Sequence, residues 1–488
     1  MNTPHTHPHS HTSPHLHTHL RRHRDIQMTE GPLFGKILLF TLPLIVTNLL
    51  QTFYNAADMM VVSLSSEENA VGAIGTTGSM INLVLNIFIG LSAGANVAVA
   101  QKIGERDENG TSRTVHTALL MSVLLGLAGT VAGLAIARPV LYAMGAQGAL
   151  LDLAVLYTRI YILGAPFLSV TNFAISIFRA KGDTRTPLVI LTLTGLLNVG
   201  LNLFFVLAAH LSVDGVAIAT LISNFTSAVL LLFFLSRDEG PCRFSFRRLR
   251  FSGAAARDII YIGVPASVQG ALFSLSNIII QSSILQVNNA SVPPGTTYQP
   301  VVNGNAAAAN LEGFIYTATT SVHLAAIAFT GQNVGAKKYD RVKRVMLSCY
   351  LLTFCVAMIV SGVIVLLREP LLGLYGVTND PDDPLRALAF HTAWIHILYM
   401  EIPYFLLAFM EIGSGVLRGM GKSVTAMIVS LVGICALRLV WIGTVFRALG
   451  TLESIYISYP ISWAVTAAVH FLFCALTLRK FRKDREPT

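Results

Sequence analysis

The sequence predicts an all-α membrane protein with twelve transmembrane helices arranged in two six-helix lobes. Charged residues make up 12% of the 488 residues, about half the share in a soluble domain, whereas hydrophobic residues make up 53%. The mean hydropathy is +0.63. A soluble chain of this size would need a polar surface that this composition lacks, so a water-soluble enzyme and a disordered chain are both excluded.

Apolar runs of about 20 residues, the length that crosses the hydrocarbon core as a helix, occur twelve times. Pro43, Pro166, Pro265 and Pro403 lie inside such runs, where a membrane helix can bend if neighbouring groups re-satisfy the freed carbonyl. The runs cover approximately residues 36–62, 70–101, 114–136, 153–178, 186–208, 214–236, 257–286, 305–333, 343–367, 386–416, 423–446 and 453–478.

Lysine and arginine are distributed unequally between the two sides of the predicted membrane. Because twelve is even, both termini lie on one side, and 28 of the 34 Lys and Arg residues flank the helices on that side. The positive-inside rule therefore predicts a multi-pass protein of the cell (inner) membrane with both termini in the cytoplasm. These clusters account for the net charge of +9 without a nucleic-acid partner.

Five segments are expected along the chain. Residues 1–30 hold eight of the fourteen histidines and lack an apolar core, which is typical of a disordered cytoplasmic tail and not of a signal peptide. The five cysteines are unclustered, and we interpret them as packing residues rather than as metal ligands. The segments are a His-rich tail (1–30), an N-terminal six-helix lobe (31–236), a basic cytoplasmic linker (237–257), a C-terminal six-helix lobe (258–478) and a basic tail (479–488).

The two predicted lobes repeat a set of motifs. Gln101 pairs with Gln332 at a separation of 231 residues, and Gly182 pairs with Gly421 at a separation of 239. Because each copy holds six helices, an even number, the lobes should share one orientation and be related by an axis along the membrane normal. Further pairs are Gly104 with Gly335, Pro139 with Pro370, Gly145 with Gly376, and Arg179 with Arg418.

These motifs also occur together in one known family. They are P-x-I-x-x-N-L-L-Q-T-F-Y-N-x-x-D at 43–58, Q-x-x-G at 101–104 and 332–335, R-x-x-G-D at 179–183, and R-G-M-G at 418–421. Over about residues 30–480 the sequence therefore resembles the multidrug and toxic compound extrusion (MATE) family. The resemblance implies a V-shaped pair of lobes around a central cavity that faces either side in turn. It also implies export of organic cations and amphipathic compounds in exchange for protons or sodium.

Energy for transport is expected from an ion gradient, a partner protein or the substrate's own gradient, and the resemblance implies the ion gradient. The sequence contains no G-x-x-x-x-G-K-[ST] motif and no soluble segment long enough for a nucleotide-binding domain. We therefore expect a monomeric secondary active antiporter, with no cofactor other than its coupling ion, that moves small cationic or amphipathic substrates across the bilayer. A flippase for a lipid-linked precursor, from a related exporter family, is the alternative. A membrane-embedded enzyme would need a clustered His/Asp or metal-ligand motif, which the sequence lacks.

The ion-coupling residues are expected in the N-terminal lobe, because ionisable groups at membrane depth are costly and usually functional. Asp58 shares a helix face with Gln51 and Asn55, and Asn198 and Asn202 are one turn apart on another helix. The resemblance implies that Asp58 and this asparagine pair meet, where they bind the coupling ion or relay protons. The alternative is that Asp58 ends its helix and faces the headgroups.

The sequence leaves the coupling ion open between protons and sodium. Asn202 stands in place of a second acid, so Asp58 is the main titratable group of this lobe. Amide oxygens around Asp58 are suited to complete a sodium cage, whereas proton binding requires Asp58 alone. We therefore favour protons.

Four charged residues lie away from the ends of the apolar runs of the C-terminal lobe: Glu312, Glu401, Glu411 and Arg438. Glu401 and Glu411 are about three turns apart and are expected on one helix face. Arg438 requires a carboxylate, for which Glu411 or Glu312 are candidates, either as a permanent ion pair or as a functional one. Residues 265–285 contain no acidic side chain, so the sodium site that the resemblance would place in this lobe is not expected.

Aromatic and histidine side chains complete the candidates. A cavity for organic cations requires aromatic faces, and Phe53, Tyr54, Tyr316 and Tyr399 are the expected wall. Histidines within or near the apolar runs are candidates for proton relay. They are His323, His391 and His396.

Overall fold

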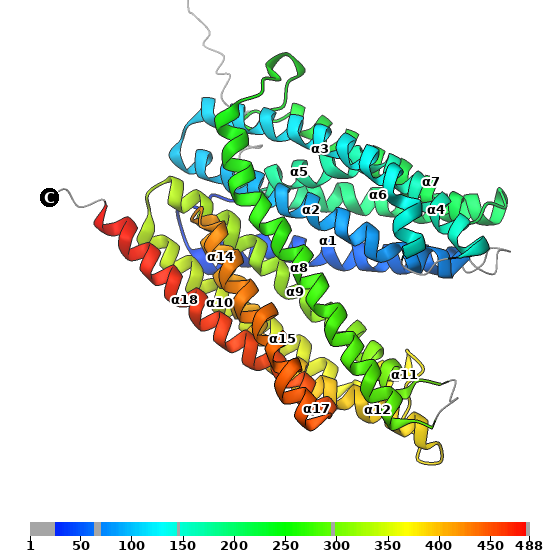
Figure 1. Cartoon of the computed structure of the whole chain (residues 1–488). Coiled ribbons are helices and arrows are strands. Elements are labelled where there is room, and N and C mark those ends of the chain that lie inside the picture. The colour runs from blue at the N-terminus through cyan, green and yellow to red at the C-terminus, as the bar shows by residue number, and fades with distance from the viewer. Residues whose placement is uncertain (1–24, 63–69, 144–146, 294–297, 485–488) are drawn as a thin grey trace, which may run out of the picture.

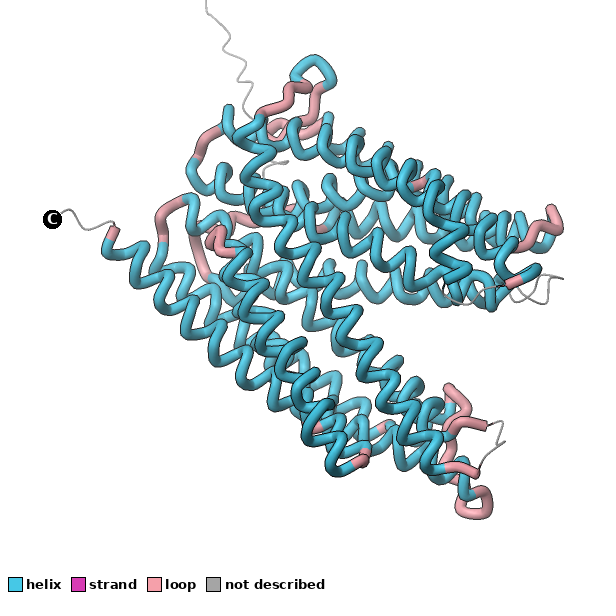
Figure 2. The backbone as a smooth tube through the Cα atoms, viewed as in Figure 1, coloured by secondary structure: helices cyan, strands magenta, loops and turns pink. Residues whose placement is uncertain are grey.

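The computed structural model describes residues 25–62, 70–143, 147–293 and 298–484, and over these residues it is all-helical (Figures 1 and 2). Ten described helical stretches are long and apolar enough to cross a membrane, and a bent pair makes an eleventh. A further helix, α9 (Pro300–Gly335), has 36 residues and carries several Asn residues, a glutamate and a histidine among its apolar residues. The predicted all-α membrane fold is confirmed.

The first half of the chain folds much as its apolar runs predict. One run differs, because the predicted helix at 153–178 is broken at Gly164, where two helices meet at 49° and Pro166 lies in the first turn of the second. A short π-helical turn, Phe204–Ala208, extends one further helix. The helices are α1 (Leu33–Val62), α2 (Ala70–Glu105), α3 (Glu108–Ala143), α4 (Gly148–Leu163), α5 (Ala165–Lys181), α6 (Arg185–Leu203) and α7 (Val213–Ser236).

The second half contains more interruptions. The predicted run at 386–416 is not one regular helix, because a π turn (Ile397–Glu401) and a 3-10 turn (Ile402–Tyr404) interrupt it. Pro403 has φ −83° and ψ 16°, which lies outside the helical region. Proline has no backbone N–H to donate, and its ring would clash with the carbonyl group one turn earlier in a regular helix. The helices are α8 (Gly253–Ser291), α9, α10 (Tyr339–Leu366), α11 (Arg368–Gly373), α12 (Pro384–His396), α13 (Phe405–Gly419), α14 (Ser423–Ser430), α15 (Leu437–Trp441), α16 (Arg447–Leu449), α17 (Leu452–Tyr456) and α18 (Ser458–Lys483).

The helices form two bundles, the first from α1–α7 and the second from α8–α18, that converge at one end and diverge at the other (Figure 1). We call the converging end, where α18 ends at Lys483, the terminus side. Helix α8 packs along α2, and a Cβ on Gly94 would overlap the carbonyl oxygen of Ile259, so only glycine permits this approach. The close packing of α2 and α8 therefore joins the bundles near the terminus side.

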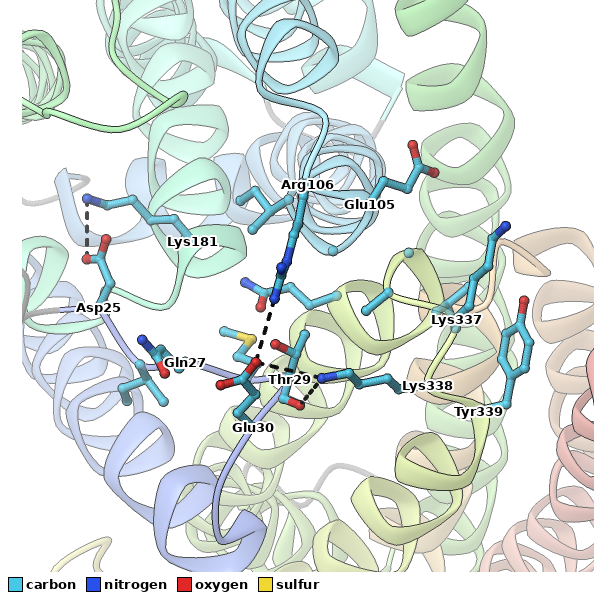
Figure 3. Close-up of a pocket in the computed structure, with 18 residues that line it drawn as sticks. Asp25, Gln27, Thr29, Glu30, Glu105, Arg106, Lys181, Lys337, Lys338 and Tyr339 are labelled. Atoms are coloured by element: carbon cyan, nitrogen blue, oxygen red, sulfur yellow. Dashed lines mark hydrogen bonds and ion pairs between the residues drawn. The ribbon is translucent and has the colours of Figure 1, made fainter.

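Helix α1 contacts both bundles. In its first half, the Phe40 ring lies edge-on to Phe329 of α9 with centroids 5.5 Å apart, and Asn48 Nδ2 donates to Ser321 Oγ at 3.1 Å. In its second half, α1 packs on α6. Residues 25–30, which precede α1, line a cavity of about 1130 Å³ between the bundles on the terminus side (Figure 3).

Candidate functional site

A chain of hydrogen bonds links Asp58 of α1 to two asparagines of α6. Asn202 Nδ2 donates to Asp58 Oδ1 at 2.5 Å and to Asn198 Oδ1 at 3.3 Å. Asn198 Nδ2 in turn lies 3.5 Å from Thr220 Oγ1 of α7. The structure thus brings Asp58, Asn198 and Asn202 together inside the first bundle.

Helical spacing and one glycine position these side chains. Asn198 and Asn202 lie four residues apart and so share one face of α6. One turn earlier, at Gly195, α6 approaches the ring of Tyr54 so closely that a Cβ would overlap the ring. The Tyr54 hydroxyl also donates to the carbonyl oxygen of Thr192 at 3.2 Å. Helix α1 is therefore held against α6 one turn before Asp58.

The two asparagines are buried, Asp58 is partly buried, and one amide oxygen has no described partner. Asn202 is 0% exposed, and its Oδ1 has no hydrogen-bond partner among the described residues. Buried polar atoms are normally paired, so an unpaired amide oxygen beside a carboxylate is an unusual feature. Among the described residues, no lysine or arginine nitrogen lies within 4.0 Å of Asp58. The oxygens of Asp58 and Asn202 are suited to bind a cation or a proton.

Two other predicted members of this group are placed differently. Gln51 is exposed on α1, almost two turns before Asp58. The side chain of Asn55 lies outside the described part of the structure. Tyr157 of α4, which sequence analysis did not select, interacts electrostatically with Asp58 and stacks on Tyr161 with centroids 6.0 Å apart. Two tyrosines four residues apart within an apolar run are the signal that would have identified them.

A second polar group lies in the other bundle. His396 Nδ1 donates to Asn305 Oδ1 at 3.0 Å, and the Tyr456 hydroxyl donates to the same oxygen at 2.8 Å. His396 Nε2 lies 3.5 Å from Glu312 Oε2. Since Nδ1 carries the donated proton, attraction between Nε2 and the carboxylate requires one further proton on either group. This histidine–glutamate pair is therefore suited to hold a proton.

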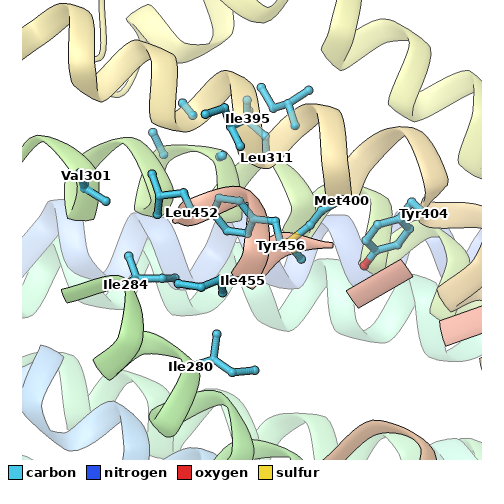
Figure 4. Packing of buried hydrophobic residues seen from close by; sticks show 14 of the residues in the cluster. Ile280, Ile284, Val301, Leu311, Ile395, Met400, Tyr404, Leu452, Ile455 and Tyr456 are labelled. Carbon is cyan, nitrogen blue, oxygen red and sulfur yellow. The ribbon is translucent and has the colours of Figure 1, made fainter. Parts of the chain in front are cut away.

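Glu401 lies near this group without a partner. Its side chain is 0% exposed, and neither carboxylate oxygen has a hydrogen-bond partner among the described residues. The prediction that Glu401 and Glu411 share a helix face assumed one regular helix. A π turn and a 3-10 turn, which end at Tyr404, interrupt the helix between the two residues. Glu411 is only partly buried. Met400 and Tyr404, which lie close to Glu401 in the sequence, belong to an apolar core (Figure 4). The core includes Ile280, Ile284, Val301, Leu311, Ile395, Met400, Tyr404, Leu452, Ile455 and Tyr456.

The predicted carboxylate partner of Arg438 is wrong. Arg438 Nε donates to Ser462 Oγ at 2.9 Å, and its guanidinium carbon lies 3.9 Å from the ring centroid of Tyr459 and 5.8 Å from that of Trp463. Within the described chain, no carboxylate oxygen lies within 4.0 Å of Arg438, so neither Glu411 nor Glu312 pairs with it. Aromatic faces and a hydroxyl compensate the charge instead.

The predicted aromatic wall divides into two pairs. Phe53 is 56% exposed, and its ring centroid lies 6.3 Å from that of Phe314 in the other bundle. Tyr316, also on α9, is 47% exposed. Tyr54 packs against α6 as described above, and Tyr399 is partly buried against the apolar core of the second bundle. Phe53 and Tyr316 are thus the two predicted wall residues with open aromatic faces.

The repeated glutamines close the terminus side. Gln332 Nε2 of α9 donates to the carbonyl oxygen of Ala180 at 2.6 Å, and Gln101 Nε2 of α2 donates to that of Gly419 at 3.0 Å. These bonds join the two bundles. Their interfacial role was not predicted, although the repeat of Q-x-x-G was the available signal.

Comparisons with known proteins agree with this architecture. The chain matches the MatE family model over residues 43–204 and 298–442. It is 25% identical to the probable multidrug resistance protein YoeA of Bacillus subtilis, over 88% of this chain and 90% of the relative. It is 23% identical to the probable multidrug resistance protein NorM of Thermotoga maritima, over 83% of this chain and 84% of the relative.

A solved structure shares the fold. It is described as the outward-facing conformation of a multidrug resistance MATE family transporter of the MOP superfamily, and it matches with a TM-score of 0.84. The match covers 94% of this chain and 99% of that structure at 21% sequence identity. With the two helical bundles, the repeated interfacial motifs and the family match over both halves, the chain belongs to the MatE family of multi-pass membrane transporters.

Proposed function

We propose that this protein is a secondary active exporter of cationic and amphipathic compounds that is driven by protons and works by alternating access. The observation that carries the proposal is the hydrogen-bonded group of Asp58, which is partly buried, with the buried Asn198 and Asn202; its carboxylate has no lysine or arginine nitrogen within 4.0 Å among the described residues. A charge in this position is expensive unless an ion neutralises it, so ion binding and release at Asp58 are energetically linked to the state of the lobe.

The arrangement of the bundles supports alternating access. They are joined on the terminus side by the two glutamine bonds and diverge at the other end (Figure 1). We place the termini in the cytoplasm, following the excess of basic residues on that side, so this conformation is open to the outside. A proton that binds Asp58 from outside neutralises its carboxylate and favours closure of the outer side. Its release to the cytoplasm restores the charge.

Exposed aromatic rings between the bundles support the proposed substrate class. Phe53 and Phe314 come from different bundles and lie with their ring centroids 6.3 Å apart. Aromatic faces attract organic cations, and the two named relatives are described as probable multidrug resistance proteins.

The flippase alternative has less support. A groove lined by several arginines and open to lipid would favour a flippase for a lipid-linked precursor, whereas Arg438, which lies deep in an apolar run, donates to Ser462 and is covered by aromatic rings. A flippase would therefore need other basic residues along the gap between the bundles.

The test is dye transport in proteoliposomes. A fluorescent cationic dye should move when a pH gradient is imposed without sodium, and it should not move when a sodium gradient is imposed at equal pH. Asp58→Asn keeps size and hydrogen bonding but removes the titratable group, so it should abolish the pH-driven flux. Asp152→Asn, which changes an exposed carboxylate of the same bundle, is the matched control and should transport normally.

Each possible result decides a part of the proposal. Transport driven only by sodium would replace the proton by sodium and make the amide oxygens ligands. Wild-type flux in Asp58→Asn would move coupling to the Glu312–His396 pair. No dye flux under either gradient, with protein that is folded and correctly reconstituted, would contradict multidrug export.

A further inference from the structure

The segment that precedes α1 lies between the two bundles on the terminus side. Residues 25–30 form one wall of the 1130 Å³ cavity, whose other walls come from the end of α2, the end of α5 and the junction of α9 with α10 (Figure 3). The segment is not helical, so its backbone carbonyls have no intrahelical partners. We call residues 25–31 the latch segment.

Side chains of the second bundle bind the backbone of the latch segment. Arg341 of α10 donates from Nε to the carbonyl oxygen of Met28 at 3.2 Å, and from Nη2 to those of Glu30 at 2.7 Å and Gly31 at 2.8 Å. Asn333 Nδ2 also donates to the Met28 carbonyl, at 3.2 Å. The Met28 side chain is 0% exposed and packs in the core formed by α9, α10, α13 and α18 with the start of α1. The second bundle thus holds the segment by a buried anchor.

The first bundle contacts the same segment through weaker interactions. Ile26 N donates to the carbonyl oxygen of Gly182 at 3.2 Å. Gly182 has φ +102°, and a Cβ there would meet the Ile26 backbone, so the turn after α5 requires glycine to accept the segment. Lys181 Nζ lies 3.5 Å from Asp25 Oδ1. These contacts bind the segment to the end of α5.

One carboxylate of the latch segment lies between cations of both bundles. Glu30 Oε1 is 3.7 Å from Arg106 Nη2, just after α2, and 3.9 Å from Lys338 Nζ, just before α10 (Figure 3). Lys338 Nζ also donates to the carbonyl oxygen of Thr29 at 3.0 Å. Separation of the bundles at this end would break at least one of the two Glu30 ion pairs.

We propose that the latch segment is a cis-acting strap that stabilises the conformation closed on the terminus side and that detaches from the first bundle each time this side opens. The latch segment is held more firmly by the second bundle than by the first, and this difference decides which contacts break when the side opens. Met28 is buried in the second bundle and Arg341 binds three carbonyls there. From α1 itself, Lys36 Nζ donates to the carbonyl oxygens of Gln27 and Glu30. The remaining contacts with the first bundle are one backbone bond and two ion pairs, of which only the Glu30–Arg106 pair has two exposed partners. The segment therefore stays with α1 and the second bundle and leaves Gly182, Lys181 and Arg106.

Distances between the bundles provide the first test. After replacement of the native cysteines, spin labels are attached at Asn109→Cys on α3 and Lys343→Cys on α10, two exposed positions outside the latch contacts. Truncation of residues 1–31, or Arg341→Gln, should increase the population with the longer distance. Because Glu30→Gln removes only exposed ion pairs, we expect a smaller shift in the ratio of open to closed, roughly threefold to fivefold.

Two controls separate the latch from general effects. Truncation of residues 1–24 retains the latch segment, and Arg344→Gln removes an exposed positive charge of the same helix that makes no ion pair within the described chain. Both should leave the distance distribution unchanged. Equal distributions in all variants, each with an unchanged elution profile, would overturn the proposal.

A reversible cross-link gives a second test that does not depend on destabilising variants. Glu30→Cys and Arg106→Cys, joined by a cleavable bis-maleimide, should stop dye transport, and reduction of the linker should restore it. Full transport in the cross-linked protein would overturn the release step. The proposal rests on alternating access. A wild-type protein that moves no dye but shows the variant-dependent distances would overturn the export function alone.

Discussion

Gln332 of the second bundle donates its side-chain amide to the carbonyl oxygen of Ala180 in the first, at 2.6 Å. The reverse exchange, from Gln101 to Gly419, is at 3.0 Å. The separations of 231 residues between the glutamines and 239 between the acceptors are those of the sequence repeat. Both acceptors lie in the last turn of a helix, where carbonyls lack intrahelical partners. Each lobe therefore caps a helix of the other.

Gln332→Ala should weaken the closure of the terminus side. The substitution leaves the Ala180 carbonyl unpaired at a buried interface, which costs about 1 kcal/mol. Gln101→Ala should act similarly, and the two effects should add to within about 0.5 kcal/mol if the bonds are independent. Thermal unfolding in detergent measures both losses. An unchanged unfolding temperature in the double variant would show that neither bond stabilises this conformation.

Asn202→Leu should reduce ion-driven dye flux at least about tenfold with little loss of expression. The amide of Asn202 orients both the Asp58 carboxylate and Asn198, and leucine supplies neither donor nor acceptor. Flux in proteoliposomes is the measurement. Asn310→Leu is the matched control, because Asn310 is exposed and its described hydrogen bond is to the carbonyl oxygen of Ala306 one turn earlier. Equal flux in both variants would remove Asn202 from the coupling site.

Gly195→Ala should destabilise the first bundle by about 1–3 kcal/mol, because its methyl group overlaps the Tyr54 ring and pushes α1 away from α6. Gly200→Ala is the control on the same helix, since nothing lies within 4 Å of the position that its methyl group would occupy and alanine is the better helix former. The double variant Gly195→Ala, Tyr54→Leu should recover part of the loss. No recovery in this double-mutant cycle would contradict the proposed contact.

Glu401→Met should raise the unfolding temperature. The carboxyl group of Glu401 is fully buried, and neither oxygen has a hydrogen-bond partner in the described chain, so its burial is unfavourable in any protonation state. Methionine has a similar length and no such cost. Glu369→Met, at an exposed position, should change stability by less than about 0.5 kcal/mol. A large loss of stability in Glu401→Met would reveal a polar partner for this group.

Cys242, in the linker between α7 and α8, should resist alkylation. Burial, with a smaller contribution from Asp238, raises the pKa of its thiol from the ordinary 9.0 to about 12. The folded state thus retains a proton that the unfolded chain loses. The resulting stabilisation is complete below about pH 9 and disappears as the pH rises towards 12. Iodoacetamide labelling at pH 8 followed by mass spectrometry should modify Cys242 only after unfolding. Rapid labelling of the native protein would contradict the burial.

Local periodicity and repetition predicted much of the fold. Apolar runs gave the long helices because the bilayer requires about 20 apolar residues per span and complete internal backbone hydrogen bonding. The same reasoning placed Asn198 and Asn202 on one face of α6, since positions four apart are neighbours on any helix. Family membership followed from the order of motifs such as Q-x-x-G and is confirmed by the family match over both halves.

Contacts between helices were less predictable. Arg438 was expected to meet Glu411 or Glu312, yet it lies against Tyr459, Trp463 and Ser462, because which residues face each other depends on how each helix is rotated. Helix rotation is set by the packing of the whole bundle and by interruptions such as the π and 3-10 turns before α13.

Composition, periodicity and repeated motifs are local properties of the chain, so they were sufficient to identify a helical membrane transporter of the MatE family. Which distant groups meet depends on the packing of the helices. The tertiary structure placed Asn202 on Asp58, His396 beside Glu312, and residues 25–30 between the two bundles. These pairings depend on how closely separate helices approach one another. Glycines permit the close approach at two places, where Gly195 meets Tyr54 and Gly94 meets Ile259.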